Sequence, residues 1–153
     1  MANTYTQLYV HLVFAVKYRI GIIMPEWKNR LFQYITALLD KRGHRMYAIN
    51  GMPDHIHILV SINPVQSISD MVGEIKRASS KWINENHFVR GKFEWQDGYG
   101  AFSYSKSQVD DVVRYIQNQE THHHKRTFRE EYLEFLKLFD ITFDEKYIFK
   151  ELQ

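Results

Sequence analysis

Residues Arg45 to Ile62 read RMYAINGMPDHIHILVSI, and this stretch decides the fold. Its two halves, Arg45–Asn50 and His55–Ile62, are rich in apolar and β-branched residues, which is typical of strands. The four residues between them, Gly51–Asp54, include a glycine and a proline and predict a tight turn. We therefore expect the two halves to pair as a β-hairpin.

The segments on either side of this hairpin predict one helix and one strand each. Proline at the first turn favours the start of the earlier helix, and a serine followed three residues later by an aspartate favours the start of the later one. The expected elements are a first strand over residues 7–16, a fourth strand supplied by residues 93–95 and 101–104, and helices that begin at Pro25 and Ser67. The order strand–helix–strand–strand–helix–strand is the split βαβ, ferredoxin-like plan. We expect an α+β fold with an antiparallel sheet and the helices on one face.

Two further helices are expected after this core. Ser107 and Asp110 repeat the capping signature and predict a helix that runs to about Glu120. A last helix is expected over residues 128–139, followed by a mixed tail. No repeat or linker divides the chain, so we expect one domain over residues 1–153, with a core of about 5–120 and a C-terminal appendage of about 121–153.

Composition limits the classes of function. The chain has 153 residues, of which 44% are hydrophobic, so it can bury one ordinary core. Its 20 Lys and Arg against 18 Asp and Glu give a net charge of +2, which supports a nucleic-acid partner only weakly. The absence of cysteine excludes disulfides, thiol catalysis and zinc–thiolate sites. No apolar run reaches the roughly 18 residues of a membrane span, and the polar N-terminus predicts a cytoplasmic protein.

The hairpin carries the first pair of candidate site residues. His55 and His57 are two apart on a strand and therefore project from the same face, while Ile56 projects from the other. Two neutral imidazoles on one face can converge on a divalent ion. The alternative is a hydrogen-bonded pair on a half-exposed sheet face. A further ligand must come from elsewhere in the chain.

The helix after the fourth strand carries the second group of candidates. Val109, Val112 and Ile116 form a buried stripe, and Tyr115 and Gln119, four residues apart, flank it. The alternative is a boundary tyrosine that buries its ring and exposes its hydroxyl. With a metal at the histidines to polarise a phosphate, Tyr115 can act as a nucleophile and form a phosphotyrosine. Because that ester preserves the bond energy, a strand can be rejoined without ATP.

These residues resemble the motifs of the HUH-type single-tyrosine transposases found in the smallest bacterial insertion sequences. In this insertion-sequence 200/605-like family, the REP-associated tyrosine transposases are near relatives. The histidine–hydrophobe–histidine motif matches His55–His57, the nucleophile matches Tyr115, and the metal-binding glutamine matches Gln119. The resemblance covers about residues 5 to 120 and keeps the family's order of elements.

The resemblance implies a metal-dependent transposase that cleaves and rejoins single-stranded DNA at hairpin-bearing element ends through a 5′-phosphotyrosine intermediate. It also implies Mg²⁺ or Mn²⁺ as the cofactor and a homodimer with active sites shared in trans. We expect no membrane partner and a bacterial, nucleoid-associated place of action. Residues 122–153 exceed the family's minimal pattern, which leaves open a domesticated relative that binds single-stranded nucleic acid without catalysis.

Other features carry weaker hypotheses. Lys76, Arg77 and Lys81 on the second long helix could line a phosphate track, although a plain solvated face is an equal alternative. The basic run His122–Arg126 could contact DNA, although a solvated helix end is the simpler interpretation. His11 on the first strand is assigned no role.

Three rival functions share parts of this pattern. A non-catalytic nucleic-acid-binding module on the same plan would need exposed aromatic side chains where this chain has His55 and His57. A replication-initiation or relaxase-type nickase shares the histidine motif but is usually larger. A metal-dependent phosphodiesterase would use water in place of Tyr115, and a trapped covalent protein–DNA adduct separates the two.

Overall fold

The computed structural model describes residues 4–19, 22–119 and 127–139. Its elements in chain order are β1 (Tyr9–Ala15), a 3-10 turn η1 (Lys17–Arg19), α1 (Pro25–Lys41), β2 (Arg45–Met52), β3 (His55–Ser61), α2 (Ile68–Glu85), β4 (Gly100–Tyr104), a 3-10 turn η2 (Lys106–Gln108), α3 (Val109–Gln117) and α5 (Phe128–Leu138). The strands pair antiparallel in the order β2-β3-β1-β4. This is the predicted ferredoxin-like core.

The predicted β2–β3 hairpin forms, but β2 runs on to Met52, so the turn is shorter than the predicted Gly51–Asp54. Its register pairs Asn50 with His57 and Met52 with His55. Gly51 is required beside the turn, because a Cβ atom there would lie 2.3 Å from the His55 carbonyl oxygen. The hairpin therefore fixes where the two histidines stand in the sheet.

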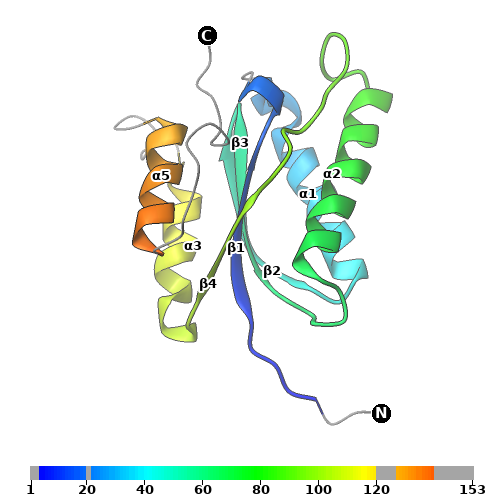
Figure 1. Cartoon of the computed structure of the whole chain (residues 1–153). Helices are drawn as coiled ribbons and strands as arrows, with labels where there is room; N and C mark the ends of the chain where they lie inside the picture. The colour runs from blue at the N-terminus through cyan, green and yellow to red at the C-terminus, as the bar shows by residue number, and fades with distance from the viewer. Residues whose placement is uncertain (1–3, 20–21, 120–126, 140–153) are drawn as a thin grey trace.

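One face of the sheet packs against α1 and α2 (Figure 1). Ile56 and Ile58 of β3 point into this layer and meet the buried side chains of α1 and α2, such as Leu31 and Ile75. The helix α2 begins as predicted, since the Ser67 hydroxyl accepts a hydrogen bond from the Asp70 backbone amide at 3.0 Å. The prediction of helices on one face is right for these two core helices.

The opposite face is covered by α3 and α5 (Figure 1). Residues of α3, including Val112 and Ile116, pack on Leu59 of β3 and Ala48 of β2. The apolar side chains that join α5 to β1 and β4 are Val13, Ala15, Phe102, Phe128, Tyr132 and Leu136. Because side chains alternate along a strand, the histidines share this covered face with Leu59. They are fully buried, so the alternative of a half-exposed sheet face is wrong.

Three predicted boundaries differ from the structure: both ends of α3 and the start of the fourth strand. The capping box forms at Ser105 with Gln108, around η2, and α3 begins at Val109. The helix α3 ends at Gln117, so Gln119 lies beyond its last residue. The fourth strand is Gly100–Tyr104, and Trp95 makes only an isolated bridge with Val16. No helix among the described residues is long and apolar enough to cross a membrane.

Candidate active site

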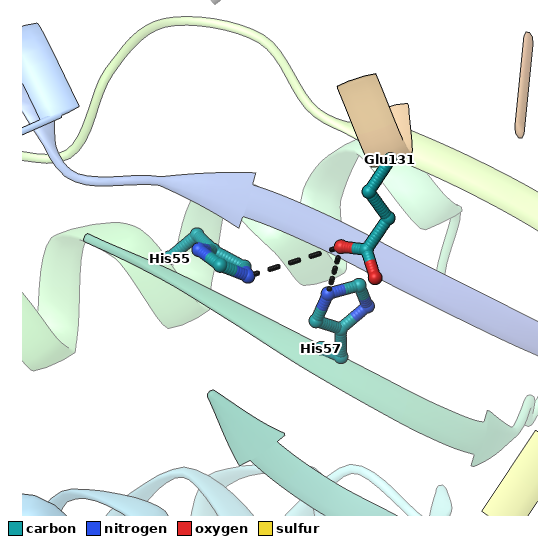
Figure 2. A group of neighbouring side chains, drawn as sticks. All are labelled: His55, His57 and Glu131. Carbon is teal, nitrogen blue, oxygen red and sulfur yellow. Dashed lines mark hydrogen bonds and ion pairs between the residues drawn. The ribbon is translucent and has the colours of Figure 1, made fainter. Parts of the chain in front are cut away.

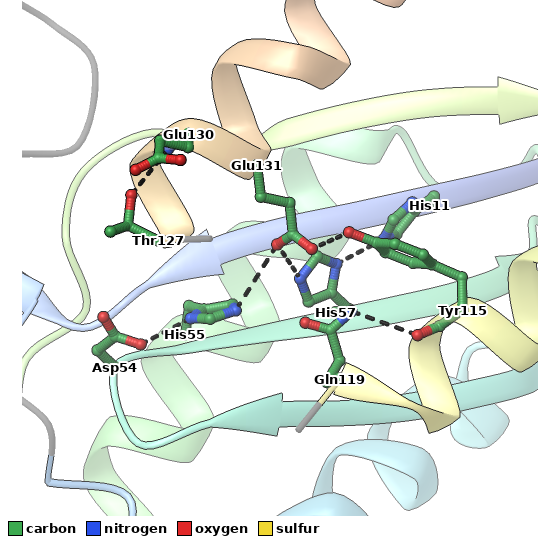
Figure 3. Close-up of polar contacts among 9 residues, drawn as sticks. All are labelled: His11, Asp54, His55, His57, Tyr115, Gln119, Thr127, Glu130 and Glu131. Atoms are coloured by element: carbon green, nitrogen blue, oxygen red, sulfur yellow. Dashed lines mark hydrogen bonds and ion pairs between the residues drawn. The ribbon is translucent and has the colours of Figure 1, made fainter. Parts of the chain in front are cut away.

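Four elements bring polar side chains together beneath α3 and α5 (Figure 3). The strands β3 and β1 supply His55, His57 and His11, α3 supplies Tyr115, and α5 supplies Glu131. The three histidines are fully buried, and Glu131 is 1% exposed. Buried polar groups of this kind are stable only when they are paired, and each of these takes part in a hydrogen bond.

The histidines and the glutamate form a three-residue cluster (Figure 2). Oε1 of Glu131 lies 3.0 Å from Nε2 of His57 and 3.9 Å from Nε2 of His55. One nitrogen or oxygen atom from each residue lies within 4.8 Å of the others. Two imidazoles and a carboxylate are a donor set that first-row divalent metals accept. The residues present therefore fit a divalent metal ion.

The remaining ligand named from the sequence, Gln119, lies at the C-terminal end of α3. Its side chain is buried and projects toward the histidine strand (Figure 3). Its amide nitrogen donates to the Tyr115 carbonyl oxygen at 3.4 Å. Its assignment as a metal ligand stays a prediction.

Tyr115 reaches the cluster from the same chain. Its hydroxyl donates a hydrogen bond to Oε2 of Glu131, and its ring centroid lies 6.1 Å from that of His57. The helix that carries it is fixed to the hairpin, because Asn50 Nδ2 donates to the Gln117 carbonyl oxygen at 3.1 Å. One chain thus brings the tyrosine and the histidines together, while the composite site in trans that the resemblance implies stays a prediction. The expected homodimer stays a prediction.

Each histidine of the pair has a partner on its Nδ1 atom. His55 Nδ1 lies 2.7 Å from an Asp54 carboxylate oxygen, and His57 Nδ1 lies 2.8 Å from Nε2 of His11. The Phe128 ring stacks on the His55 ring with centroids 4.0 Å apart. These contacts turn both Nε2 atoms toward Glu131, because a hydrogen bond at one ring nitrogen fixes the orientation of the other.

Burial changes the protonation of the groups around the cluster. Burial, followed by the charges of Glu134 and Asp54, raises the pKa of Glu131 to about 8. Burial also lowers the pKa of His11 to about 3, which keeps that ring neutral at ordinary pH. A carboxylate whose charged form is disfavoured in this way is stabilised when a cation binds beside it.

A cavity of about 270 Å³ opens between α3 and α5 beside the tyrosine. Tyr115 and Glu131 line it together with apolar side chains such as Val112 and Phe135. Tyr115 is half-buried, and its side chain faces this cavity.

Sequence reasoning missed two residues of this site, Glu131 and His11. Glu131 lies outside the resemblance, but it interrupts the buried stripe that Phe128, Tyr132 and Leu136 form on α5. A carboxylate on an apolar helical stripe is a signal that could have found it. His11 gives a similar signal, because all seven residues of its strand are buried and, apart from the hydroxyl of Tyr9, only His11 among them has a polar side chain.

The basic residues proposed to contact DNA lie on α2, on the other side of the sheet from the histidines. Lys76 donates to the carbonyl oxygens of Gln96 and Gly98 at 2.9 and 2.6 Å, and burial lowers its pKa to about 8. The Nζ atom of Lys81 lies 3.9 Å from Oε1 of Glu85. A DNA contact by Lys76, Arg77 or Lys81 stays a prediction, and His122–Arg126 lie outside the described residues.

Comparisons with known proteins agree with this arrangement. The model of the family described as "Transposase IS200 like" matches residues 4–119. The ISDra2 transposase TnpA of Deinococcus radiodurans is 28% identical over 118 residues, which cover 74% of this chain and 84% of that protein. The transposase of insertion sequence element IS200 from Salmonella typhimurium is 28% identical over 123 residues, which cover 75% of this chain and 80% of the relative.

Two solved structures share the fold. A crystal structure of a candidate transposase from Deinococcus radiodurans superposes with a TM-score of 0.61 at 25% identity, covering 78% of this chain and 95% of that one. A REP-associated tyrosine transposase bound to a REP hairpin superposes with a TM-score of 0.61 at 15% identity, covering 80% of this chain and 73% of that one. The second likeness concerns the fold alone.

Proposed function

The chain belongs to the family of IS200-like transposases, and on that premise we propose that it cleaves and rejoins single-stranded DNA through a covalent bond between Tyr115 and a 5′ phosphate. One observation carries the proposal. The Tyr115 hydroxyl is hydrogen-bonded to the carboxylate that also contacts the buried histidine pair, so a nucleophile and a metal-binding cluster meet in one chain.

We propose that His55 and His57, through their Nε2 atoms, and Glu131, through its carboxylate, hold a divalent ion, either Mg²⁺ or Mn²⁺. Gln119 is a further candidate ligand through its amide oxygen. Two imidazoles in the donor set favour Mn²⁺, because Mg²⁺ prefers oxygen ligands. When bound, the ion supplies Lewis-acid polarisation of the scissile phosphate.

The two oxygens of Glu131 have different neighbours in this proposal. Oε1 faces the histidines, while Oε2 accepts the hydrogen bond from the Tyr115 hydroxyl. In its ionised form Glu131 is therefore the nearest acceptor for the proton that the phenol must lose before it attacks. The Tyr115 oxygen then forms a bond to phosphorus, the bond from phosphorus to the leaving 3′ oxygen breaks, and that oxygen takes up a proton.

The ester can be reversed by a second strand. A 3′ hydroxyl of another DNA end attacks the phosphotyrosine, loses its proton and restores the Tyr115 hydroxyl, so atoms balance over the two steps. The cavity between α3 and α5 is the route by which the DNA backbone would approach. Hairpin-bearing element ends are the proposed substrate, as the resemblance to the single-tyrosine transposases implies.

We further propose that residues 5–119 and α5 act as one domain. The helix α5 packs on β1 and β4 through an apolar cluster and places Glu131 against the histidines. A core without this helix would lack the carboxylate, so α5 belongs to the proposed site.

The experiment is to incubate the full chain with Mn²⁺ and a labelled single-stranded DNA hairpin, denature the protein and look for protein-bound label. We expect an adduct that maps to Tyr115 and is absent in Tyr115→Phe, which should still bind the hairpin. Tyr104→Phe is the matched control, because Tyr104 lines the same cavity and should leave the adduct intact.

The outcomes separate the rival functions. Label on a different tyrosine, or an adduct formed by Tyr115→Phe, would overturn the assignment of the nucleophile. Cleavage without any adduct would indicate a phosphodiesterase that uses water. Hairpin binding without cleavage or adduct would indicate a domesticated relative that binds single-stranded nucleic acid.

A further inference from the structure

His11 occupies a position that the proposed chemistry has not used. It lies on β1, beside Leu59 of β3 and Phe102 of β4, and is fully buried. Its Nε2 atom lies 2.8 Å from Nδ1 of His57. The edge of its ring meets the Phe135 ring, with centroids 5.3 Å apart. An imidazole held between aromatic rings with one polar contact has little reason to be there for packing alone.

The contact extends into a line of hydrogen bonds across the site (Figure 3). His11 Nε2 meets His57 Nδ1, His57 Nε2 lies 3.0 Å from Glu131 Oε1, and Glu131 Oε2 accepts from the Tyr115 hydroxyl. Only one hydrogen atom can lie between His11 Nε2 and His57 Nδ1, since one of the two nitrogens must accept. Which ring carries that proton decides the state of His57 Nε2, because a neutral imidazole has one N–H and one acceptor nitrogen.

Two arrangements satisfy this geometry. In the first, His11 donates from Nε2 to His57 Nδ1, and His57 donates from Nε2 to Glu131. The Nε2 atom of His57 then carries a hydrogen and cannot bind a metal. In the second, His57 donates from Nδ1 to His11 Nε2, and the lone pair of His57 Nε2 is available to a metal. His11 then carries its hydrogen on Nδ1, an atom with no hydrogen-bond partner among the residues that the structure describes.

We propose that His11 is a positioning residue that accepts the Nδ1 proton of His57 and so holds His57 in the metal-binding tautomer. The proposal rests on the metal site proposed above. The contrast with His55 supports it, because the Nδ1 partner of His55 is an Asp54 carboxylate oxygen, which accepts but does not donate when ionised. His11 can do either, so His57 is the ligand of the pair whose tautomer changes.

The protons balance when the pair changes from the first arrangement to the second. When a metal replaces the hydrogen on His57 Nε2, that proton leaves to solvent. The proton on His11 Nε2 passes to His57 Nδ1, and His11 Nδ1 takes up one proton from solvent. Both rings stay neutral, so the pair releases no net proton when the ion binds. Binding instead exchanges the hydrogen bond from His57 to Glu131 for a bond from each of these residues to the metal.

The test compares His11→Phe with His11→Gln in the full chain. Phenylalanine keeps an aromatic ring in the apolar enclosure but removes the acceptor, whereas the amide oxygen of glutamine can reach the position of Nε2. We expect Mn²⁺ affinity, measured by titration calorimetry, to fall roughly 10–100-fold in His11→Phe. In His11→Gln it should return to within a few-fold of the wild-type affinity.

A second readout follows the tautomer directly. In the chelator-treated wild-type protein, ¹⁵N NMR should show the His57 hydrogen on Nε2, and with Zn²⁺ as a diamagnetic probe it should show the hydrogen on Nδ1. Asp54→Asn is the matched control, because it changes the partner of His55 and should leave the metal-free tautomer of His57 unchanged. If His11→Phe does not fold, His11→Asn replaces it, since its amide is too short to reach His57.

The outcomes distinguish this inference from the proposed function. Wild-type affinity in His11→Phe or His11→Asn, or a His57 tautomer that does not change with Zn²⁺, would overturn the role of His11 and leave the metal site standing. A wild-type protein that binds neither Mn²⁺ nor Zn²⁺ would overturn the metal site and with it the role of His11. In that case a hydrogen on His57 Nε2 in the metal-free spectrum would show only that His57 donates to Glu131.

Discussion

Replacing Glu131 with glutamine should stabilise the metal-free protein at neutral pH and abolish its stabilisation by Mn²⁺. Glu131 is 1% exposed, and burial is the main cause that raises its pKa from 4.5 to about 8. Between these two pH values the folded protein keeps the proton, while the unfolded chain has lost it. Folding is therefore opposed by the ionisation of this carboxyl, and the free energy of unfolding falls as pH rises through this window.

The magnitude follows from the size of the shift. Each pKa unit corresponds to about 1.4 kcal/mol, so at pH 7, which is 2.5 units above the ordinary pKa, the wild-type protein is roughly 3 kcal/mol less stable than one with a neutral side chain there. At pH 5 the difference is below about 1 kcal/mol. Glutamine supplies that neutral side chain with nearly the same shape. For a chain of this size the pH 7 difference raises the Tm by roughly 6–12 °C.

The assay is thermal unfolding followed by circular dichroism at pH 5 and pH 7, first in chelator and then with excess Mn²⁺. An ion at 100 times its Kd stabilises the folded state by about 2.7 kcal/mol, a gain that Glu131→Gln should lack because its carboxylate ligand is gone. Glu134→Gln is the matched control on the same helix. Glu134 is exposed, and this variant should keep the Mn²⁺ gain and raise the metal-free Tm less than Glu131→Gln does, because it removes only the second cause of the raised pKa of Glu131.

Two results would refute the reasoning. If Glu131→Gln were less stable than the wild-type protein in chelator at pH 7, the carboxylate would be stabilising the fold and its ionisation would not oppose folding. If Mn²⁺ raised the Tm of Glu131→Gln as much as that of the wild-type protein, Glu131 would not be a ligand.

Three further predictions test the surroundings of the cluster. Asp54→Asn should lower Mn²⁺ affinity roughly 10–100-fold in calorimetry, because the amide can donate to His55 Nδ1 and so favour the wrong tautomer; an unchanged Kd would contradict this. Mixing Tyr115→Phe with His57→Ala protein should not restore cleavage of a labelled hairpin, since the tyrosine and the histidine meet within one chain; restored cleavage would indicate a site shared in trans. Leu136→Ala should lower the free energy of unfolding in denaturant by about 2–5 kcal/mol and also weaken Mn²⁺ binding, because Leu136 anchors the helix that carries Glu131. A variant that is less stable but binds Mn²⁺ with full affinity would contradict this link between the packing of α5 and the metal site.

The sequence predicted the fold and the histidine pair because both depend on local patterns. The alternation of His55 and His57 with isoleucines follows from strand geometry, and the tight turn after Met52 closes the hairpin. Tyr115 could be selected because its helix has a buried stripe. The predicted position of Gln119 on a continuous helix was wrong, because α3 ends at Gln117 and no local signal in the sequence marked that end.

Glu131 could not be predicted in the same way. It stands 74 residues from His57, on a helix whose docking depends on contacts between α5 and two strands that are distant in sequence. A helical stripe shows which face of α5 is buried but not which surface buries it. For the same reason, the sequence did not predict that α3 and α5 cover the second face of the sheet, nor that the histidines are fully buried.

One carboxylate links the two halves of the proposed chemistry. Oε1 of Glu131 contacts His57 and Oε2 contacts Tyr115, so any shift of α5 changes the metal cluster and the nucleophile together. The apolar side chains around Glu131 on α5 pack against the sheet, and their packing offsets the cost of placing a carboxyl in a buried site. An ion that neutralises this carboxyl would also tighten α5 against the sheet. Metal binding and the positioning of Tyr115 are therefore expected to be coupled, and a variant that loosens α5 should impair both at once.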